Sequence, residues 1–407
     1  MYDVLFLGRL FPKNKESELR AKARVDMQDA ANVLQWNLIN GLIENGVSQM
    51  TVVSLLPIDS WPKHYKEPFI FSDKECYGDG FTFEISGFCN ITYLKQVLYR
   101  TSCNSAVKQW AKKKGDLPKV LICYSEKNVL MRAMAAAKKI DPTIICIQII
   151  ADITEFASNA DKNWLKDKAI ASEIRTNRKL RWAVDGFVLL TKQMKDKLGI
   201  QKPYMVMEGI VPQKTLSKCT AKDNSVKTVL YTGSMNRKYG ITNLLDAFLT
   251  IKDPNYRLVL CGLGNAEPDI NIACQKDSRI QYLGKMPHDK VLELQSRATV
   301  VVNPRQNNEE FTKYSFPSKT LEYLASGVPL VAYRLDGIPE EYDEYIHYVP
   351  DNSCEALALQ IQSVCAIEAE TRRSAAEKAR KFVFEEKNRK SQTRRILDFI
   401  KLCREKS

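Results

Sequence analysis

The sequence contains only three histidines, no pair of cysteines in Cys-x-x-Cys spacing and no apolar run of the length that a membrane-spanning helix needs. Its eleven cysteines are scattered among 407 residues, and several lie inside apolar runs. This pattern is typical of reduced core thiols and excludes a disulfide frame or a zinc site. Because the chain begins directly with an expected strand instead of a basic leader, we expect a cytoplasmic protein.

The charge is unbalanced toward the basic side. The sequence has 61 Lys and Arg residues against 48 Asp and Glu, a formal net charge of +13. Nucleic acid, anionic lipid and phosphorylated substrates are all attracted by such a surface. No zinc finger, RNA-recognition signature or Arg-rich tail accompanies the excess, so we expect no nucleic-acid partner. An ordinary solvated surface explains part of the excess as well.

Apolar runs alternate with amphipathic helical patterns along the chain. Strands are expected at 4–8, 50–56, 82–85, 119–124, 143–150, 186–190, 205–207, 229–233, 258–261, 280–284, 300–303, 328–333 and 346–349. Such alternation predicts an α/β protein with parallel sheets covered on both faces. Since 407 residues exceed one average domain, we predict two domains, 1–208 and 209–386, with a polar, Lys-rich linker near 213–227.

A long loop is predicted between the first strand and the first helix. The strand ends at Gly8, and the next helical pattern begins only at Ala30. Loops of about 20 residues in compact domains are usually functional or disordered. This loop offers Lys13, Arg20 and Arg24 to a phosphate or carboxylate group. Mobile, solvated charge is an equally good interpretation of these residues.

A basic helical pattern with aromatic residues covers 92–113. Tyr93 and Trp110 share it with several lysines, and the run Lys112-Lys113-Lys114 follows at its end. A basic amphipathic helix with aromatic residues can lie on an anionic bilayer, which predicts weak and salt-sensitive binding to anionic vesicles. A core-packed helix with a wet basic face fits the same pattern.

Asp152 directly follows the apolar run 143–150. Ligand sites of α/β sheets form beyond the carboxyl ends of the strands, so this carboxylate is a candidate site residue. An aspartate in this place is equally typical of the N-cap of a short helix.

The stretch SFPSKTLEYLASGVP, residues 315–329, contains the most informative pattern. Pro317 suits the first helical position, because its ring presets φ and its missing N–H has no intrahelical partner there. Gly327 and the proline two residues later end the helix. Apolar runs at 300–303 and 328–333 flank it. The stretch therefore predicts a βαβ unit whose helix begins at the carboxyl end of a strand.

The start of this helix is an expected anion site. The backbone N–H groups of Ser318, Lys319 and Thr320 should have no intrahelical acceptors, and the helix dipole is positive there. The Lys319 ammonium adds a point charge. Glu322 lies one turn further, where its carboxylate could accept hydrogen bonds from two sugar hydroxyls. An ordinary helix with a solvated lysine and glutamate is the alternative interpretation.

Residues 317–329, Pro-Ser-Lys-x-x-Glu-Tyr-Leu-Ala-Ser-Gly-x-Pro, resemble the donor-site segment of nucleotide-sugar glycosyltransferases of the GT-B fold, in the large retaining group known as family 4. The resemblance implies two Rossmann-like, doubly wound domains that face across a cleft, with the donor on the second domain and the acceptor on the first. It implies that the helix start holds the diphosphate and that Glu322 binds the ribose hydroxyls. It also implies that the final helix, 387–407, crosses back onto the first domain.

The loop GSMNRKYG, residues 233–240, resembles the Gly-Arg…Lys-Gly donor loop of that family, whose cations neutralise the diphosphate. Ser234 stands where an arginine is usual, so Arg237 and Lys238 are the expected phosphate contacts. The family also has a frequent Glu-x7-Glu pair whose first glutamate commonly positions the donor sugar. This chain has Tyr314 at that position, which leaves the identity of the sugar open.

The expected site therefore has three groups of residues and no metal or other cofactor. The catalytic candidates are Asp152, Lys319, Arg237 and Lys238. The donor-binding candidates are Gly8, Gly233, Ser234, Lys285, Tyr314, Ser315, Phe316, Pro317, Ser318, Thr320 and Glu322. The acceptor-binding candidates are Lys13, Arg20 and Arg24.

The expected reaction is transfer of a hexose-type sugar from a nucleotide diphosphate sugar to a hydroxyl of a sugar or lipid-linked sugar, with retention and without a metal. The expected setting is bacterial-type surface polysaccharide or glycolipid assembly, peripherally at the inner face of the membrane. A GT-B nucleotide-sugar epimerase is one alternative, although it should need more acid and base groups than three histidines readily supply. A non-catalytic basic protein that binds lipid or nucleic acid is the other.

Overall fold

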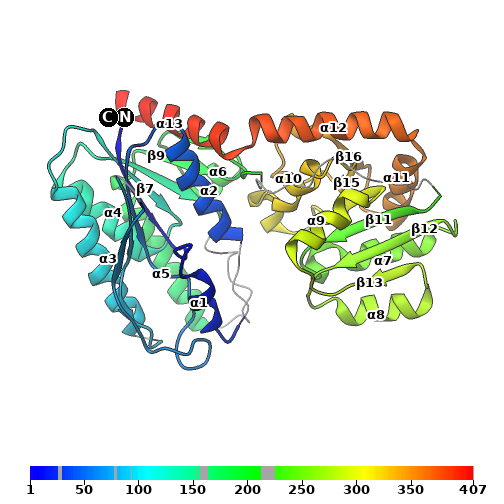
Figure 1. The fold of residues 1–407 in the computed structure, drawn as a ribbon, viewed down its shortest axis with the longest axis horizontal. Coiled ribbons are helices and arrows are strands. Elements are labelled where there is room, and N and C mark those ends of the chain that lie inside the picture. The colour runs from blue at the N-terminus through cyan, green and yellow to red at the C-terminus, as the bar shows by residue number, and fades with distance from the viewer. Residues whose placement is uncertain are drawn as a thin grey trace. The chain divides into compact units, whose positions relative to one another are not determined.

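The structure is a computed structural model that describes residues 1–25, 30–77, 80–92, 94–153, 155, 164–211 and 225–406. Residue contacts divide the chain into two units (Figure 1). The first unit consists of Met1–Met207 and Arg389–Ser407, and the second of Glu208–Asn388. Each unit is an α/β domain around a sheet that is mostly or entirely parallel, in agreement with the expected fold class.

The sheet of the first unit has the strand order β10-β9-β8-β7-β1-β2-β5-β4. Its strands are β1 (Asp3–Gly8), β2 (Gln49–Ser54), β4 (Asp73–Cys76), β5 (Phe81–Ile85), β7 (Lys119–Tyr124), β8 (Ile145–Ile150), β9 (Gly186–Leu189) and β10 (Tyr204–Val206). All neighbouring pairs are parallel except β4 with β5. The short strands β3 (Phe69–Ile70) and β6 (Phe88–Cys89) pair separately. Because the order reverses between β1 and β7, the carboxyl ends of these two strands flank a switch point.

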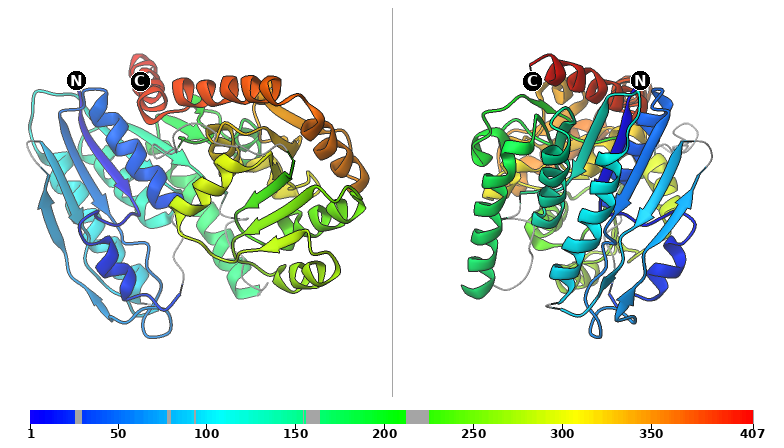
Figure 2. Two further views of the ribbon diagram at one scale, coloured as in Figure 1. Left: turned by 45° about the vertical axis from the view of Figure 1, so that its right-hand side comes forward. Right: turned by 90° about the vertical axis from the view of Figure 1, so that its left-hand side faces the viewer.

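Helices cover both faces of this sheet (Figure 2). They are α1 (Glu16–Ala21), α2 (Ala30–Glu44), α3 (Leu94–Lys112), α4 (Asn128–Ile140), α5 (Trp164–Leu180), α6 (Met194–Leu198) and α13 (Arg389–Glu405), with a 3-10 turn at Arg181–Ala183. The C-terminal helix α13 packs against α2. A Cβ on Gly41 would lie 2.6 Å from Thr393 Oγ1, so the glycine permits the close approach, and Asn45 Nδ2 donates to Lys390 O at 2.8 Å.

The expected loop between β1 and α2 is partly wrong, because it contains α1. Only Leu19 of this helix is buried, which explains why no apolar periodicity announces it. The helix is supported instead by ion pairs one turn apart. Arg20 Nη2 lies 2.7 Å from Glu16 Oε1, and Lys22 Nζ lies 2.7 Å from Glu18 Oε1.

The aromatic side chain of α3 that the structure describes belongs to the core. Val107 is fully buried, and Trp110 is 6% exposed with its indole N–H donating to Asp3 Oδ1 at 3.0 Å. Tyr93 lies outside the described residues. Lys108 and Lys112 are exposed, so the core-packed interpretation with a wet basic face is correct for this part of the helix. Among the described residues, no helix combines the length and apolarity that crossing a bilayer requires.

The sheet of the second unit is entirely parallel, in the order β13-β12-β11-β14-β15-β16. Its strands are β11 (Lys227–Thr232), β12 (Tyr256–Cys261), β13 (Ile280–Tyr282), β14 (Val300–Asn303), β15 (Leu330–Tyr333) and β16 (Ile346–Val349). In order of appearance this is 3-2-1-4-5-6, the order of the Rossmann fold. The switch point therefore lies between β11 and β14.

Alternate residues of the strands enter two separate cores. Val229 and Tyr231 pack with α7 (Ile241–Thr250), α8 (Glu267–Lys276) and α11 (Cys354–Ala366) on one face. Leu230 packs on the other face with α10 (Ser318–Ala325) and α12 (Ala369–Glu386), where α9 (His288–Arg297) also contributes. The described residues of the unit also form 3-10 turns at Arg237–Tyr239, Glu310–Tyr314 and Glu340–Tyr345. Cys261 is a buried free thiol, as expected.

A buried ion pair joins the two chain segments that lie at the border of the second unit. Lys387 Nζ lies 2.6 Å from Glu208 Oε1, and the two side chains are 2% and 1% exposed. Lys387 also pairs with the half-exposed Glu341 at 2.6 Å, and Tyr342 Oη donates to Glu208 at 2.5 Å. The Val211 N–H donates to Lys387 O at 2.8 Å. An ion pair and a backbone hydrogen bond therefore hold together residues near the beginning and the end of this unit.

Candidate functional site

The loops that follow β11, β12 and β13 meet at the carboxyl edge of the second sheet. The Gly233 N–H donates to Cys261 O at 2.9 Å, and the Gly262 N–H donates to Gly284 O at 2.8 Å. A Cβ on Gly262, whose φ is +145°, would lie 1.7 Å from Gly233 O. Only glycine allows the two backbones to approach so closely. The edge beside the switch point is thus lined by closely packed backbone.

Helix α10 begins at this edge directly after β14. Pro317 is the N-cap, and Ser318 is the first helical residue, one position later than expected. The Thr320 N–H, which was expected to be free, donates to Pro317 O at 2.8 Å because the first turn is tight. The N–H groups of Ser318 and Lys319 have no hydrogen-bond partner among the described residues. Two donors therefore remain for an anion at the positive end of the dipole.

Lys319 and Glu322 are in contact with each other. Lys319 Nζ lies 2.8 Å from Glu322 Oε1, and the side chains are 32% and 12% exposed. Gln295 of α9 is fully buried, and its Nε2 donates to the same Oε1 at 2.5 Å and to Thr232 Oγ1 at 2.8 Å. Glu322 Oε2 has no partner in the described part of the chain. The contacts of Lys319 and Gln295 with Oε1 therefore orient the carboxylate, and Oε2 is left to accept hydrogen bonds from a ligand.

Gln295 is absent from the sequence-based candidates, although a signal for it exists. It lies on the same helical face as Val291 and Leu292, both of which are 9% exposed or less. A glutamine on the apolar face of a helix needs a buried polar partner. That partner, Glu322, is far away in the sequence, so only the fold identifies it.

Gly233 lies beside Lys319. A Cβ on Gly233, whose φ is +151°, would lie 3.3 Å from Tyr231 Oη and 3.7 Å from Lys319 Cε. Tyr323 of α10 ties the helix to the same strand end, since its Oη accepts the Thr232 N–H and donates to Thr232 O, both at 2.8 Å. The end of β11 and the start of α10 are therefore held in fixed relation.

Arg237 and Lys238 already have partners in this structure. Arg237 is 54% exposed, and its Nε lies 2.6 Å from Asp269 Oδ2 of α8. The hydrogen bond raises the pKa of Arg237 and lowers that of Asp269. The Lys238 ammonium lies 5.2 Å from the ring centroid of Tyr239 and 5.8 Å from that of Phe311. Their roles as phosphate contacts stay predictions.

The other donor-binding candidates divide into surface and core residues. Ser234 and Lys285 are exposed, and Ser234 Oγ accepts from Asn236 Nδ2 at 2.5 Å. Tyr314 and Ser315 are partly buried. Phe316 is 6% exposed and packs 5.4 Å from the ring of Tyr342, and Thr320 is fully buried. The side chains of these last two residues are core elements, so only their backbone groups remain as donor-site candidates.

The chain is similar to known glycosyltransferases in part of its sequence and in its fold. Residues 212–382 match the model of a family described as glycosyl transferases group 1. The chain has the GT-B fold, and its second unit matches this glycosyltransferase family. Sucrose-phosphate synthase from Thermosynechococcus elongatus has a similar structure, with a TM-score of 0.67, 14% identity and coverage of 100% of both chains. α,α-Trehalose 6-phosphate synthase from Burkholderia multivorans gives 0.66 at 11% identity, over 98% of this chain and 96% of that one.

A third similar structure is Anabaena HepE in complex with UDP. Its TM-score is 0.60 at 12% identity, over 98% of this chain and 100% of that one. No curated protein matches the sequence. At these identities the likeness to solved structures concerns the fold, whereas the family match falls on the unit that contains α10.

The acceptor candidates lie in the first unit, and two of them have local partners. Arg20 pairs with Glu16 in α1 and lies 4.9 Å from the Phe11 ring. The Lys13 ammonium lies 4.6 Å from the Trp36 ring, and desolvation lowers the pKa of Lys13. Arg24 is exposed. Gly8 ends β1, where a Cβ would lie 2.3 Å from Gln35 Oε1.

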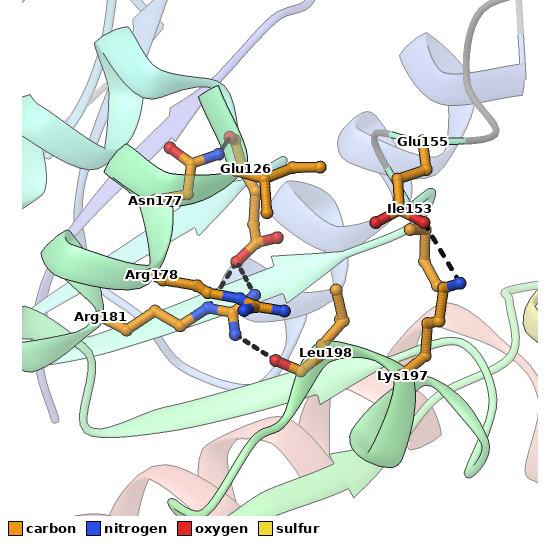
Figure 3. Close-up of a pocket in the computed structure, with 9 residues that line it drawn as sticks. Glu126, Ile153, Glu155, Asn177, Arg178, Arg181, Lys197 and Leu198 are labelled. Carbon is orange, nitrogen blue, oxygen red and sulfur yellow. Dashed lines mark hydrogen bonds and ion pairs between the residues drawn. The ribbon is translucent and has the colours of Figure 1, made fainter. Parts of the chain in front are cut away.

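A pocket that sequence reasoning missed opens near the carboxyl ends of β7 and β8 (Figure 3). Arg181 Nη2 lies 2.8 Å from Glu126 Oε1, and Arg181 Nη1 donates to Leu198 O at 2.5 Å. Burial raises the pKa of Glu126, and Arg181 opposes that shift. Lys197 Nζ pairs with Glu155 Oε2 at 3.2 Å across the opening. Among the described residues, no group of His, Cys, Asp and Glu could hold a metal ion.

Asp152 follows β8 at the same edge and is exposed, and it makes no capping hydrogen bond within the described residues. The protein around it nevertheless desolvates the carboxyl and raises its pKa. We expect Asp152→Asn to slow sugar transfer while the affinity for donor nucleotide stays unchanged, as measured by initial rates and titration calorimetry. Asp398→Asn, at an exposed position of α13, is the control. Wild-type rates in Asp152→Asn would remove the residue from the site.

Proposed function

We propose that this glycosyltransferase moves a sugar from a nucleotide diphosphate sugar to a hydroxyl of a sugar or lipid-linked sugar. The observation that carries the proposal is the start of α10 at the switch point, where Lys319, two free N–H groups and Glu322 Oε2 lie together. The structurally similar HepE was solved with UDP, and also with UDP and glucose. A similar trehalose-phosphate synthase from Burkholderia xenovorans was solved with glucose-6-phosphate.

The chemistry requires stabilisation of the diphosphate as it leaves. Negative charge develops on that group, so fixed cations and N–H donors that point at it lower the barrier most. The Ser318 and Lys319 N–H groups and the Lys319 ammonium supply such donors. Glu322 Oε2 would accept hydrogen bonds from the ribose hydroxyls, while Gln295 and Lys319 hold Oε1.

Two finer properties belong to the proposal. Retention of configuration is supported by the resemblance of residues 317–329 to a retaining group, and NMR of the anomeric proton in the product tests it. Metal independence is supported by the cations available to the diphosphate, Lys319 at the helix start and the expected phosphate contacts Arg237 and Lys238, which together would offset its charge. Full activity in excess chelator is the expected result.

We further propose that the enzyme acts in surface polysaccharide or glycolipid assembly at the cytoplasmic face of a membrane. Because Trp110 is buried, this part of α3 can contact a membrane surface only through its exposed cations, Lys108 and Lys112. Electrostatic contact of this kind contributes about 1 kcal/mol per cation and is screened by salt. Co-sedimentation with anionic vesicles at low salt tests it, and no binding there would exclude it.

A panel of UDP-, GDP-, ADP- and CMP-sugars tests the proposed reaction. A ligand at about 100 times its Kd stabilises the folded state by about 2.7 kcal/mol, so thermal shifts should identify the nucleotide. Turnover is then measured with sugar and lipid-linked acceptors. An isomeric nucleotide sugar formed without acceptor would indicate an epimerase. Salt-sensitive lipid or nucleic-acid binding without turnover of any donor would indicate a binding protein.

A further inference from the structure

Arg305 is a buried cation in the second unit with no carboxylate partner among the described residues. It follows β14 after Pro304 and is 8% exposed. Nη2 donates to Ser315 Oγ at 2.6 Å, and the buried Nε has no hydrogen-bond partner. Burial of a charge is costly unless an opposite charge or several hydrogen bonds compensate it. This side chain therefore has positive charge and hydrogen-bonding capacity that the described protein does not use.

The guanidinium lies beside two aromatic rings. Its carbon lies 4.5 Å from the ring centroid of Phe311 and 5.5 Å from that of Tyr239. These rings fix its plane and provide weak cation–π stabilisation without neutralising it. Desolvation lowers the pKa of Arg305, and the phenols of Tyr239 and Tyr231 oppose this shift. Arginine remains charged despite such a shift, since its ordinary pKa lies far above neutral pH.

Arg305 lies between the two loops that form the site. On one side, a Cβ on Gly240 would lie 1.9 Å from Pro304 O, so the loop 233–240 packs directly on the residue before Arg305. On the other side, Ser315 opens the segment that leads into α10. Tyr231, whose phenol affects the pKa of Arg305, donates a hydrogen bond from its Oη to Ser234 O at 3.0 Å. The positive charge of Arg305 therefore lies in the same region of the second unit as Lys319 and Gly233.

We propose that Arg305 is a second cation of the diphosphate subsite, whose counter-ion is the diphosphate of the donor. The proposal rests on the proposed function. A guanidinium has five N–H donors in a planar fork, which suits phosphate oxygens better than an ammonium does. Because the rings hold it in place before the ligand arrives, little reorganisation is needed on binding. Arg305 also holds Ser315, so it positions the segment before α10.

Binding of inorganic pyrophosphate tests the proposal without any contribution from the nucleobase or the ribose. We expect Arg305→Gln to weaken pyrophosphate and nucleoside diphosphate binding by about 10- to 100-fold, the usual range for lost charged hydrogen bonds. Binding of the uncharged nucleoside should change by less than about twofold, because a local charge was removed and the fold was not. Arg305→Lys keeps the positive charge and should lose much less affinity for pyrophosphate.

Arg279→Gln is the matched control. Arg279 is also a largely buried arginine of this unit, with its guanidinium 5.1 Å from the Phe248 ring, but it pairs with Asp277 at 2.6 Å before β13. Replacing Arg279 should lower the stability of the protein without changing its preference for pyrophosphate over nucleoside.

Four results would overturn the proposal. Wild-type affinity for pyrophosphate in Arg305→Gln would show that the charge is not used, while turnover by the wild type would leave the proposed function intact. Equal loss of nucleoside and pyrophosphate binding would show a purely structural role. If Arg305→Gln does not fold, the test passes to Arg305→Lys, where equal loss of nucleoside and pyrophosphate binding in a folded protein contradicts the proposal. A wild type that binds neither pyrophosphate nor any nucleoside diphosphate would overturn both proposals together.

Discussion

Replacing Glu322 by alanine is expected to weaken nucleoside diphosphate binding by about 10- to 100-fold. Hydrogen bonds to a charged acceptor contribute about 1.5–3 kcal/mol each, and Glu322 Oε2 is placed to accept them from the ribose. Bonds that are equal in the ground and transition states appear in KM and not in kcat. Titration calorimetry and initial rates with the donor found in the panel measure the effect.

A 2′,3′-dideoxy nucleotide identifies the group that Glu322 binds. The wild type should discriminate strongly against this analogue, and Glu322→Ala should discriminate hardly at all. Glu293→Ala is the control, because Glu293 lies on α9 and pairs at the surface with Lys290 at 3.0 Å and Arg297 at 2.7 Å. Equal discrimination by wild type and Glu322→Ala would show that the carboxylate does not contact the ribose. Lys319→Ala should instead reduce mainly kcat, since charge on the leaving diphosphate develops only in the transition state.

Replacing Lys387 by methionine is expected to destabilise the second unit by about 3–5 kcal/mol. The change leaves the Glu208 carboxylate, whose side chain is 1% exposed, without its cation. An unpaired buried charge is expensive, whereas an apolar pair of similar volume is often tolerated. Urea denaturation should therefore show a lower midpoint for Lys387→Met and substantial recovery in the double variant Glu208→Gln/Lys387→Met.

Lys381→Met provides the comparison for this result. Lys381 is on α12, the helix that ends one residue before Lys387, with its side chain 70% exposed and its Nζ 3.8 Å from Glu385 Oε1. Surface pairs of this kind contribute about 0–1 kcal/mol, so its midpoint should stay close to that of the wild type. Similar midpoints for Lys387→Met and Lys381→Met would mean that the buried pair does not stabilise the unit.

The βαβ unit around α10 could be predicted from the sequence because local rules decide it. An apolar run, Val300–Asn303, a proline just before the helix and Gly327 after it determine where strand and helix lie. The parallel, doubly wound character follows from the alternation of apolar strands with amphipathic helices. The same local signals placed Lys319 and Glu322 one turn apart at the carboxyl edge of a strand.

Features that depend on partners far away in the chain could be decided only by the tertiary structure. Trp110 fits a membrane-facing helix as well as a core helix until its hydrogen bond to Asp3, 107 positions away, is known. Gln295 and Arg305 look like ordinary polar residues of a helix and a loop. The role of Gln295 depends on Glu322, which the packing of α9 beside α10 brings to it, and that of Arg305 depends on Tyr239, which the packing of the loop 233–240 brings to it. Local propensity determines the elements of this protein, whereas the burial of charges and amides is determined by long-range packing that no short segment encodes.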